Sequence, residues 1–258
     1  MITTNTPLRV APFAGSRLGA VLFDLDALTD IECDGHRVAF NAAFAAHGLD
    51  VRWSRTRYRQ LLALRDERQR INAELRRREI EAECDVLMQL LTDELYATKT
   101  MIFDEVIAHA NLEPRPGLLD FVSDAMATGV VVGVVTTGSR RWAEPLVRRV
   151  LGDGWVSSLV TADDVAKTLP CGEAFARGLD ELGASTHTAA AIVGSAAGLR
   201  AATTTGLTTV VVTGDGAPDL RAAAAVRPDY AAPEPMSIAG CQRLHDDWLA
   251  AHAPAAVA

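Results

Sequence analysis

The chain has 258 residues, of which 49% are hydrophobic and 22% charged, and its formal net charge is -8. This composition is typical of a globular protein, and the length fits a main domain with a smaller insertion. The negative balance disfavours wholesale nucleic-acid binding, which needs a concentrated basic surface, and no apolar stretch approaches the 18 residues of a membrane span. We therefore expect neither a nucleic acid nor a membrane among the partners.

The first 18 residues read MITTNTPLRVAPFAGSRL, with proline and polar residues where a secretory signal would carry its apolar segment. We interpret this stretch as a loose leader and expect a cytoplasmic protein. The four cysteines lie far apart and form no CxxC pair, which argues against a zinc site and against a disulfide framework.

The first predicted element is a strand over residues 19–25, GAVLFDL, a short apolar run of the kind buried on both faces of a sheet. Asp24 and Asp26 lie at its end, two residues apart. Taken alone, aspartates at such a place are more often helix caps or turn residues than catalytic groups.

Residues 34–110 contain helical patterns and no predicted strand. Five apolar side chains step by three and four residues and predict one buried helix face: Ile80, Cys84, Leu87, Leu91 and Leu95. Between residues 52 and 78 stand ten arginines and three acids, which we interpret mainly as a solvated helical surface. The sequence thus predicts an all-helical cap at 34–110 inserted into a core made of 1–33 and 111–258.

Strand and helix patterns alternate after the PRPG turn at 114–117. The expected strands are 130–135, 155–160, 189–193 and 207–212, and the expected helices include 121–126, 142–151, 173–183 and 196–203. Such alternation predicts an α/β fold, with a Rossmann-like parallel sheet covered by helices on both faces. The carboxyl ends of its strands should bring together Asp24 and Asp26, Thr136 and Thr137, and Gly194 and Ser195.

These motifs occur in a familiar order: an aspartate pair, a helical insertion, VVTTGS, DDVAKTLP and IVGSAAGLRAA. In this order the chain resembles the haloacid dehalogenase superfamily, and most closely its CbbY-like and β-phosphoglucomutase-like branch of phosphatases. His36, twelve residues after Asp24, and the surrounding run 36–53 are similar to the first cap helix of that branch.

The resemblance implies a role for each matching residue. Asp24 would be the nucleophile that forms a phospho-aspartyl intermediate, and Asp26 the general acid and base. Both aspartates would help to bind Mg²⁺. The substrate, a small phosphorylated sugar, would contact four side chains: Thr136, Thr137, His36 and Arg68.

Two motifs depart from the family pattern. Leu169 occupies the place of the lysine that precedes proline, and Lys167 stands two residues earlier. Val193 and Gly194 replace the two acids of the last motif, and no Asp or Glu occurs between 181 and 215 to restore them. Lys167 could substitute for the lysine, and Asp163 or Asp164 could approach a metal.

Smaller departures lie beside the aspartates and in the insertion. Ala27 and Leu28 replace a glycine and threonine, and alanine resists the positive φ of a tight turn. A Gly-Gly-Lys run of CbbY-like members appears as Asp66, Glu67 and Arg68, which keeps the basic end and loses the glycines.

An electrostatic argument indicates how the loss of the lysine and of the metal-binding acids affects the reaction barrier. A carboxylate that attacks an anionic phosphate at ~3 to 4 Å meets a repulsion on the order of several kcal/mol, which a metal and a lysine normally offset. We therefore predict a catalytically impaired phosphatase that retains phosphate binding. Two alternatives are a slow phosphatase that uses Asp24 and Lys167, and a nucleotide-binding or regulatory module suggested by GSAAG at 194–198.

Overall fold

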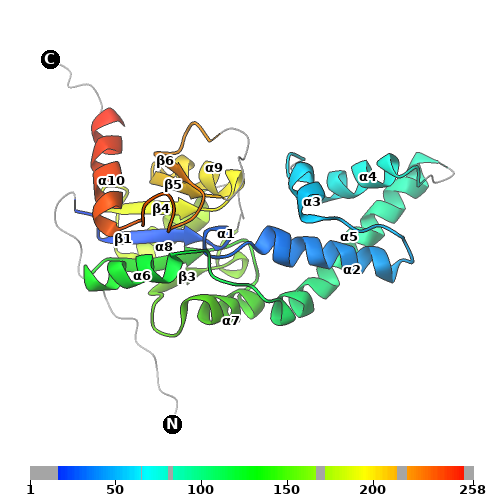
Figure 1. The fold of residues 1–258 in the computed structure, drawn as a ribbon, viewed down its shortest axis with the longest axis horizontal. Coiled ribbons are helices and arrows are strands. Elements are labelled where there is room, and N and C mark those ends of the chain that lie inside the picture. The colour runs from blue at the N-terminus through cyan, green and yellow to red at the C-terminus, as the bar shows by residue number, and fades with distance from the viewer. Residues whose placement is uncertain (1–16, 65, 81–83, 167–171, 214–219, 253–258) are drawn as a thin grey trace, which may run out of the picture. The chain divides into compact units, whose positions relative to one another are not determined.

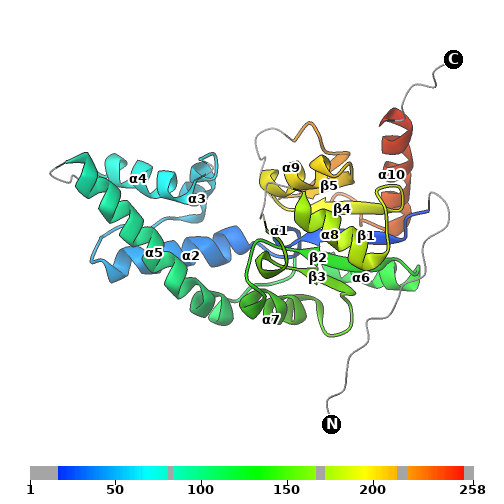
Figure 2. The same ribbon diagram turned by 180° about the vertical axis from the view of Figure 1, so that it is seen from behind.

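The computed structural model describes residues 17–64, 66–80, 84–166, 172–213 and 220–252. The chain divides into two compact units. Residues 1–29 and 114–258 form what we call the α/β unit, and residues 30–113 form the helical unit. Figures 1 and 2 show the elements of both units from opposite sides.

The α/β unit is built on a six-stranded sheet in which every neighbouring pair is parallel. The strands lie in the order β3-β2-β1-β4-β5-β6. Their bounds are β1 (Ala20–Asp24), β2 (Val131–Val135), β3 (Ser158–Val160), β4 (Ala189–Val193), β5 (Thr208–Val212) and β6 (Ala225–Arg227). The predicted α/β class is confirmed, and β6, whose side chains are only partly buried, is the strand that the hydrophobic pattern did not reveal.

Helices cover both faces of this sheet. They are α1 (Leu25–Leu28), α6 (Leu118–Ala127), α7 (Arg140–Leu151), α8 (Glu173–Leu182), α9 (Ala196–Thr204) and α10 (Ile238–His252). Leu22 of β1 faces the cluster formed with α8 and α9, whereas Phe23 packs edge-on against Phe121 of α6 at 6.1 Å. This alternation along β1 explains why the strand is apolar at every position before Asp24.

Among its described residues, the helical unit has helices and no strand. After a π-helical turn at Glu32–His36 come α2 (Arg37–Ala46), α3 (Arg55–Leu61), α4 (Glu67–Arg77) and α5 (Asp85–His109). Its core is rich in aromatic side chains, with Phe40 4.8 Å and Phe44 5.0 Å from the ring of the fully buried Trp53.

The buried face of α5 differs from the predicted stripe. Ile80 and Cys84 precede the helix, and Leu87 is 44% exposed. The side chains that α5 buries are Met88, Thr92, Leu95, Lys99, Phe103 and Ile107. Leu95 is buried as predicted, and Ile80 and Leu91 pack against the core of the unit. The buried face also includes Thr92 and Lys99, which no hydrophobic pattern marks.

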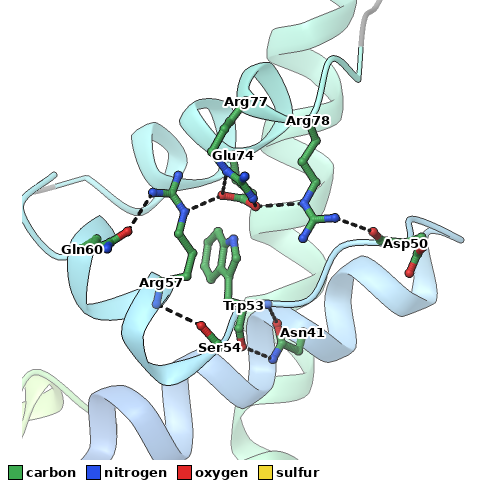
Figure 3. A network of polar contacts seen from close by, with 9 residues as sticks. All are labelled: Asn41, Asp50, Trp53, Ser54, Arg57, Gln60, Glu74, Arg77 and Arg78. Carbon is green, nitrogen blue, oxygen red and sulfur yellow. Dashed lines mark hydrogen bonds and ion pairs between the residues drawn. The ribbon is translucent and has the colours of Figure 1, made fainter.

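Three of the arginines in the basic segment surround one acid instead of pointing freely into solvent. The carboxylate of Glu74 is fully buried and accepts bonds from Arg57 Nε at 2.8 Å, Arg77 Nη2 at 2.5 Å and Arg78 Nε at 3.0 Å. Arg78 also donates to the carbonyl of Asp50 (Figure 3). This network joins α3, α4 and the chain before α3 inside the helical unit.

A membrane-spanning helix is not found among the described residues: none of their helices is both long and apolar enough.

Candidate active site

The candidate site lies where the chain reverses its direction of travel across the sheet. From β1 the chain proceeds to β2 and β3 on one side, and then returns to place β4 on the other side of β1. Asp24, the last residue of β1, pairs with Val135, so that Thr136 begins the neighbouring loop. Ligands of open parallel sheets bind at such switch points, beyond the carboxyl ends of the strands.

Asp24 is held by backbone amides from two loops. Its Oδ1 accepts hydrogen bonds from Ala27 N and from Gly194 N, both at 2.8 Å, and the side chain of Ser195 lies 3.5 Å from Oδ2. The bond to Ala27 makes Asp24 the N-cap of the short helix α1. Ala27 therefore adopts a helical turn instead of the strained turn that the lost glycine suggested.

Burial dominates the electrostatics of Asp24, whose residue is only 2% exposed. Loss of hydration raises the pKa of its carboxyl from 3.8 to about 6, even though the bonds from Gly194 and Ala27 and the charge of Arg115 act in the opposite direction. A carboxylate at this place is thus costly at neutral pH.

Gly194 leaves no room for the acidic side chain that the resemblance implies at this position. A Cβ built on it would overlap the carbonyl carbon and oxygen of Asp26 and lie 2.7 Å from Ala27 N. A Cβ on Gly198 would overlap Oδ2 of Asp24. The backbone after β1 and the carboxylate of Asp24 therefore fill the space beside β4, and an acid at position 194 would require the backbone to move.

Donors from elsewhere in the α/β unit hold the turn after β1 in this place. The carbonyl of Asp26 accepts from Arg115 Nε at 2.7 Å, that of Leu28 from Arg115 N at 2.9 Å, and that of Ala27 from the Tyr230 hydroxyl at 2.9 Å. Tyr230 is fully buried. Neither residue was a candidate from the sequence, because a single arginine in PRPG and a late tyrosine carry no motif.

The resemblance implied a magnesium ion held with the help of Asp24 and Asp26. Hard cations take carboxylate and carbonyl oxygens. Here Oδ1 of Asp24 already accepts two amides and the Asp26 carbonyl accepts a guanidinium, so these oxygens do not fit a divalent cation as they are arranged. In the described part of the chain, no three His, Cys, Asp or Glu side chains are grouped so as to hold a metal.

Thr136 and Thr137 lie on the loop after β2, next to the loop that carries Asp24. The Thr136 hydroxyl is largely buried and accepts from Gly138 N at 3.0 Å, whereas Thr137 is exposed. The ring of Trp142 lies so close to Gly138 that a Cβ there would overlap it. Trp142 is thus a natural spectroscopic reporter for this loop.

The residues considered as replacements for the lost lysine and the lost acids either fall outside the described residues or have other partners. Lys167 and Leu169 fall outside the described residues. Asp164 accepts from Thr161 N, from the Thr161 hydroxyl and from Arg140 Nη2, and Asp163 accepts from Arg140 N at the start of α7. Both acids therefore stabilise their own loop and the beginning of a helix.

His36 and Arg68 belong to the helical unit. Arg68 donates to Asp93 at 2.7 Å and its guanidinium lies 3.8 Å from the ring centre of Tyr96. His36 stacks on Phe103 at 4.3 Å between ring centres, and its Nδ1 is buried. Both therefore have structural partners within their own unit.

Sequence comparison supports the resemblance over most of the chain. The model of the haloacid dehalogenase-like hydrolases matches residues 18–227. Protein CbbY of Cereibacter sphaeroides is 32% identical over 198 residues, which cover 76% of this chain and 84% of that protein. A CBBY-like protein of Arabidopsis thaliana is 29% identical over 198 residues, covering 74% of this chain and 62% of the relative.

Solved structures agree with the sequence comparison. CbbY from Rhodobacter sphaeroides in complex with phosphate is 29% identical, with a TM-score of 0.65 over 86% of this chain and 98% of that one. The same values hold for a mutant of that CbbY in complex with xylulose-(1,5)bisphosphate. The chain therefore belongs to the haloacid dehalogenase-like hydrolase family.

Proposed function

We propose that this protein is a sugar-phosphate phosphatase by descent in which Asp24 is packed into the interior and phosphate esters are turned over very slowly or not at all. The position of Asp24 carries this proposal. The residue is 2% exposed, its Oδ1 accepts backbone amides from both flanking loops, and its Oδ2 lies against Gly198 and 3.5 Å from the Ser195 hydroxyl, so the carboxylate is turned toward the start of α9.

Charge compensation supports the same proposal. An attacking carboxylate needs cations close to the transferred phosphoryl group. The acids expected at positions 193 and 194 are a valine and a glycine, and the backbone of Asp26 occupies the space beside Gly194. We infer that Mg²⁺ binds weakly, and we expect the rate to fall by several powers of ten, because each ~1.4 kcal/mol of barrier is tenfold.

Recognition of a small phosphorylated sugar is the part of the ancestral function that we propose is retained. The Thr136 and Thr137 hydroxyls lie on the loop after β2, and CbbY of Rhodobacter sphaeroides, a relative of 29% identity, has been solved with phosphate. The proposed ligand is therefore a sugar phosphate, and the proposed location remains cytoplasmic.

Geometry does not favour the nucleotide-binding alternative. Gly194 N donates to Asp24 and Gly198 N donates to the Ser195 hydroxyl, so two of the amides of this segment that could cradle a phosphate already have partners. The slow-phosphatase alternative requires Asp24 to leave its amides and Lys167 to approach it. Loss of turnover in Lys167→Ala would support that alternative.

Turnover is tested with xylulose-(1,5)bisphosphate and Mg²⁺, with release of inorganic phosphate as the readout and an active family member assayed in parallel. The wild-type protein should release phosphate at the background rate, and Asp24→Asn should equal it. Robust release by the wild type that disappears in Asp24→Asn would refute the loss of catalysis.

Binding is tested separately by titrating the same sugar bisphosphate while following Trp142 fluorescence. Saturable quenching that weakens in Thr137→Val and further in Thr136→Val is expected, and Ser157→Ala serves as a control away from the loop. No response of the wild type at millimolar ligand would contradict retained binding.

A further inference from the structure

The helical unit carries a surface pocket of about 650 Å³ between the ends of two helices. The chain turns away from α2 at Gly48 and from α4 at Glu79, with left-handed φ angles of 68° and 56°. Each turn is closed by the next amide, from Leu49 N to the Phe44 carbonyl and from Ile80 N to the Leu75 carbonyl, both at 3.0 Å. The residues that line the pocket are Gly48, Leu49, Asp50, Arg77, Arg78 and Ile80.

Part of the pocket wall is apolar. Leu49 and Ile80 are half-buried and pack against the aromatic core of the helical unit. A cleft of this size that combines apolar side chains with a few polar groups is typical of sites for small molecules. The pocket is thus large enough for a small metabolite, and it offers the apolar body of such a ligand two side chains.

Arg77 and Arg78 form the cationic side of the pocket, and the buried Glu74 holds both of them. Arg77 donates to the Glu74 carboxylate from Nε at 3.2 Å and from Nη2 at 2.5 Å, and Arg78 donates to it from Nε at 3.0 Å (Figure 3). Arg78 Nη1 also donates to the Asp50 carbonyl at 3.2 Å. A surface arginine normally loses conformational entropy when it binds an anion, and these two have already lost much of it.

Each of the two arginines keeps one terminal nitrogen for a ligand. Within the part of the chain that the structure describes, Arg77 Nη1 and Arg78 Nη2 donate to no acceptor, and the two side chains are 51% and 34% exposed. A carboxylate has two oxygens that accept charge-assisted bonds, so one group can accept a bond from each arginine.

The charges of this region favour a ligand with a single negative charge. Arg57, Arg77 and Arg78 share one buried acid, Glu74. The exposed Asp50 side chain lines the same pocket and brings a second negative charge, so these five groups sum to one positive charge. Asp50 therefore opposes the second charge of a dicarboxylate or a phosphate ester.

We propose that this pocket binds a small monocarboxylic acid, with its carboxylate on Arg77 and Arg78 and its apolar body on Leu49 and Ile80. Glu74 acts as a positioning residue, because it fixes the two guanidinium groups from the interior. The site lies within the helical unit, and it is independent of the Asp24 region and of the function proposed for that region.

The test is a calorimetric titration of the full chain with isocaproate, a branched monocarboxylate. Isocaproamide serves as the uncharged analogue and succinate as the doubly charged one. The wild type should bind isocaproate at least about tenfold more tightly than either of them. Arg77→Met should lower the isocaproate affinity about tenfold, whereas Arg76→Met, which removes an exposed arginine of the same helix outside the pocket, should bind like the wild type.

A carboxylate bound at the Thr136 loop would contribute equally to Arg76→Met and Arg77→Met, so the difference between these variants reports on the pocket. Equal isocaproate affinity in the two variants would overturn the proposal, as would the absence of isocaproate binding by the wild type at millimolar concentration.

Asp50→Asn tests the charge argument and keeps the backbone carbonyl that Arg78 contacts. This variant should bind succinate about threefold more tightly than the wild type does, because the repulsion of the second carboxylate is removed. If Arg77→Met does not fold, unchanged succinate affinity in Asp50→Asn overturns the proposal in its place.

Discussion

Two buried carboxylates, one in each unit, have pKa values that are shifted in opposite directions. Asp24 and Glu74 are 2% and 0% exposed. The pKa of Asp24 is raised to about 6 because burial outweighs its backbone bonds. Burial also acts to raise the pKa of Glu74, but the bonds from Arg77, Arg78 and Arg57 together outweigh it and lower the pKa to about 2.

The difference lies in what each carboxylate contacts. Backbone amides offer partial charges, which offset only part of the lost hydration of Asp24. Three guanidinium groups offer full charges, which more than offset the lost hydration of Glu74 (Figure 3). Glu74 is thus stabilised as an anion, whereas Asp24 is an anion that its surroundings tolerate poorly.

Removal of the Glu74 charge should have the largest effect. Glu74→Ala leaves Arg57, Arg77 and Arg78 without their shared acid, and we expect a cost of about 3 kcal/mol, the lower end of the range for a broken buried ion pair, because these guanidinium groups are 27 to 51% exposed and can be hydrated. Denaturation of the helical unit, followed by the fluorescence of its Trp53, measures the loss. A change below about 0.5 kcal/mol, as expected for the control Glu94→Ala, would contradict the role of the network.

Removal of the Asp24 charge should act in the opposite direction. A pKa raised from 3.8 in the unfolded chain to about 6 in the folded protein corresponds to about 3 kcal/mol. The folded state binds the extra proton, so wild-type stability should fall as pH rises from about 4 to 6 and then level off. Asp24→Asn should therefore be more stable than the wild type at pH 7.5, by up to about 3 kcal/mol.

The same comparison contains its own control. Well below pH 3.8 the Asp24 carboxyl is neutral in both states, so the advantage of Asp24→Asn should disappear there. The contribution of Glu74 has the other sign and is lost only as pH falls from 4.5 toward 2. Equal stability of Asp24→Asn and wild type at all pH values would show that the carboxylate is not strained.

Addition of one methyl group at Gly194 tests how tightly the two loops pack. Gly194→Ala should destabilise the α/β unit by about 1 to 3 kcal/mol, because the new Cβ meets backbone atoms of Asp26 and Ala27 that cannot rotate away. Gly240→Ala in α10 is the matched control, since its Cβ would lie 3.4 Å from the nearest atom. Urea denaturation distinguishes them, and equal midpoints would argue against close packing.

Arg115 should give the smallest effect on stability. Arg115→Met removes the bond to the Asp26 carbonyl, for a cost of about 1 kcal/mol, and it removes a positive charge that lowers the pKa of Asp24. The pH range in which stability falls should therefore move upward. Arg115→Lys keeps the charge and should leave that range nearly unchanged; a downward movement in Arg115→Met would contradict this account.

Local patterns predicted much of the sheet and little of the site geometry. The runs at 189–193 and 207–212 are strands β4 and β5 because continuous apolar residues suit strands buried on both faces. By contrast, the buried face of α5 includes Thr92 and Lys99. The Thr92 hydroxyl donates to the Met88 carbonyl one turn earlier in the same helix, and the Lys99 ammonium is satisfied by Glu67 of another helix.

The site could not be derived from motifs because its geometry depends on distant donors. The sequence indicated that Asp24, Gly194 and Ser195 would meet, and it identified the missing acids. It did not indicate that Arg115 and Tyr230 would hold the carbonyls after β1, or that Asp24 would accept the amide of Gly194. Those contacts join residues 89 to 203 positions apart, beyond the reach of any local pattern.

The overlap between position 194 and the backbone of Asp26 makes the order of substitutions matter. An aspartate introduced at 194 alone meets a backbone that Arg115 and Tyr230 hold in place. An acid at position 194 therefore requires the backbone after β1 to change first, which in turn requires the bonds from Arg115 and Tyr230 to break. Two substitutions in these loops are thus expected to depend on the order in which they are made.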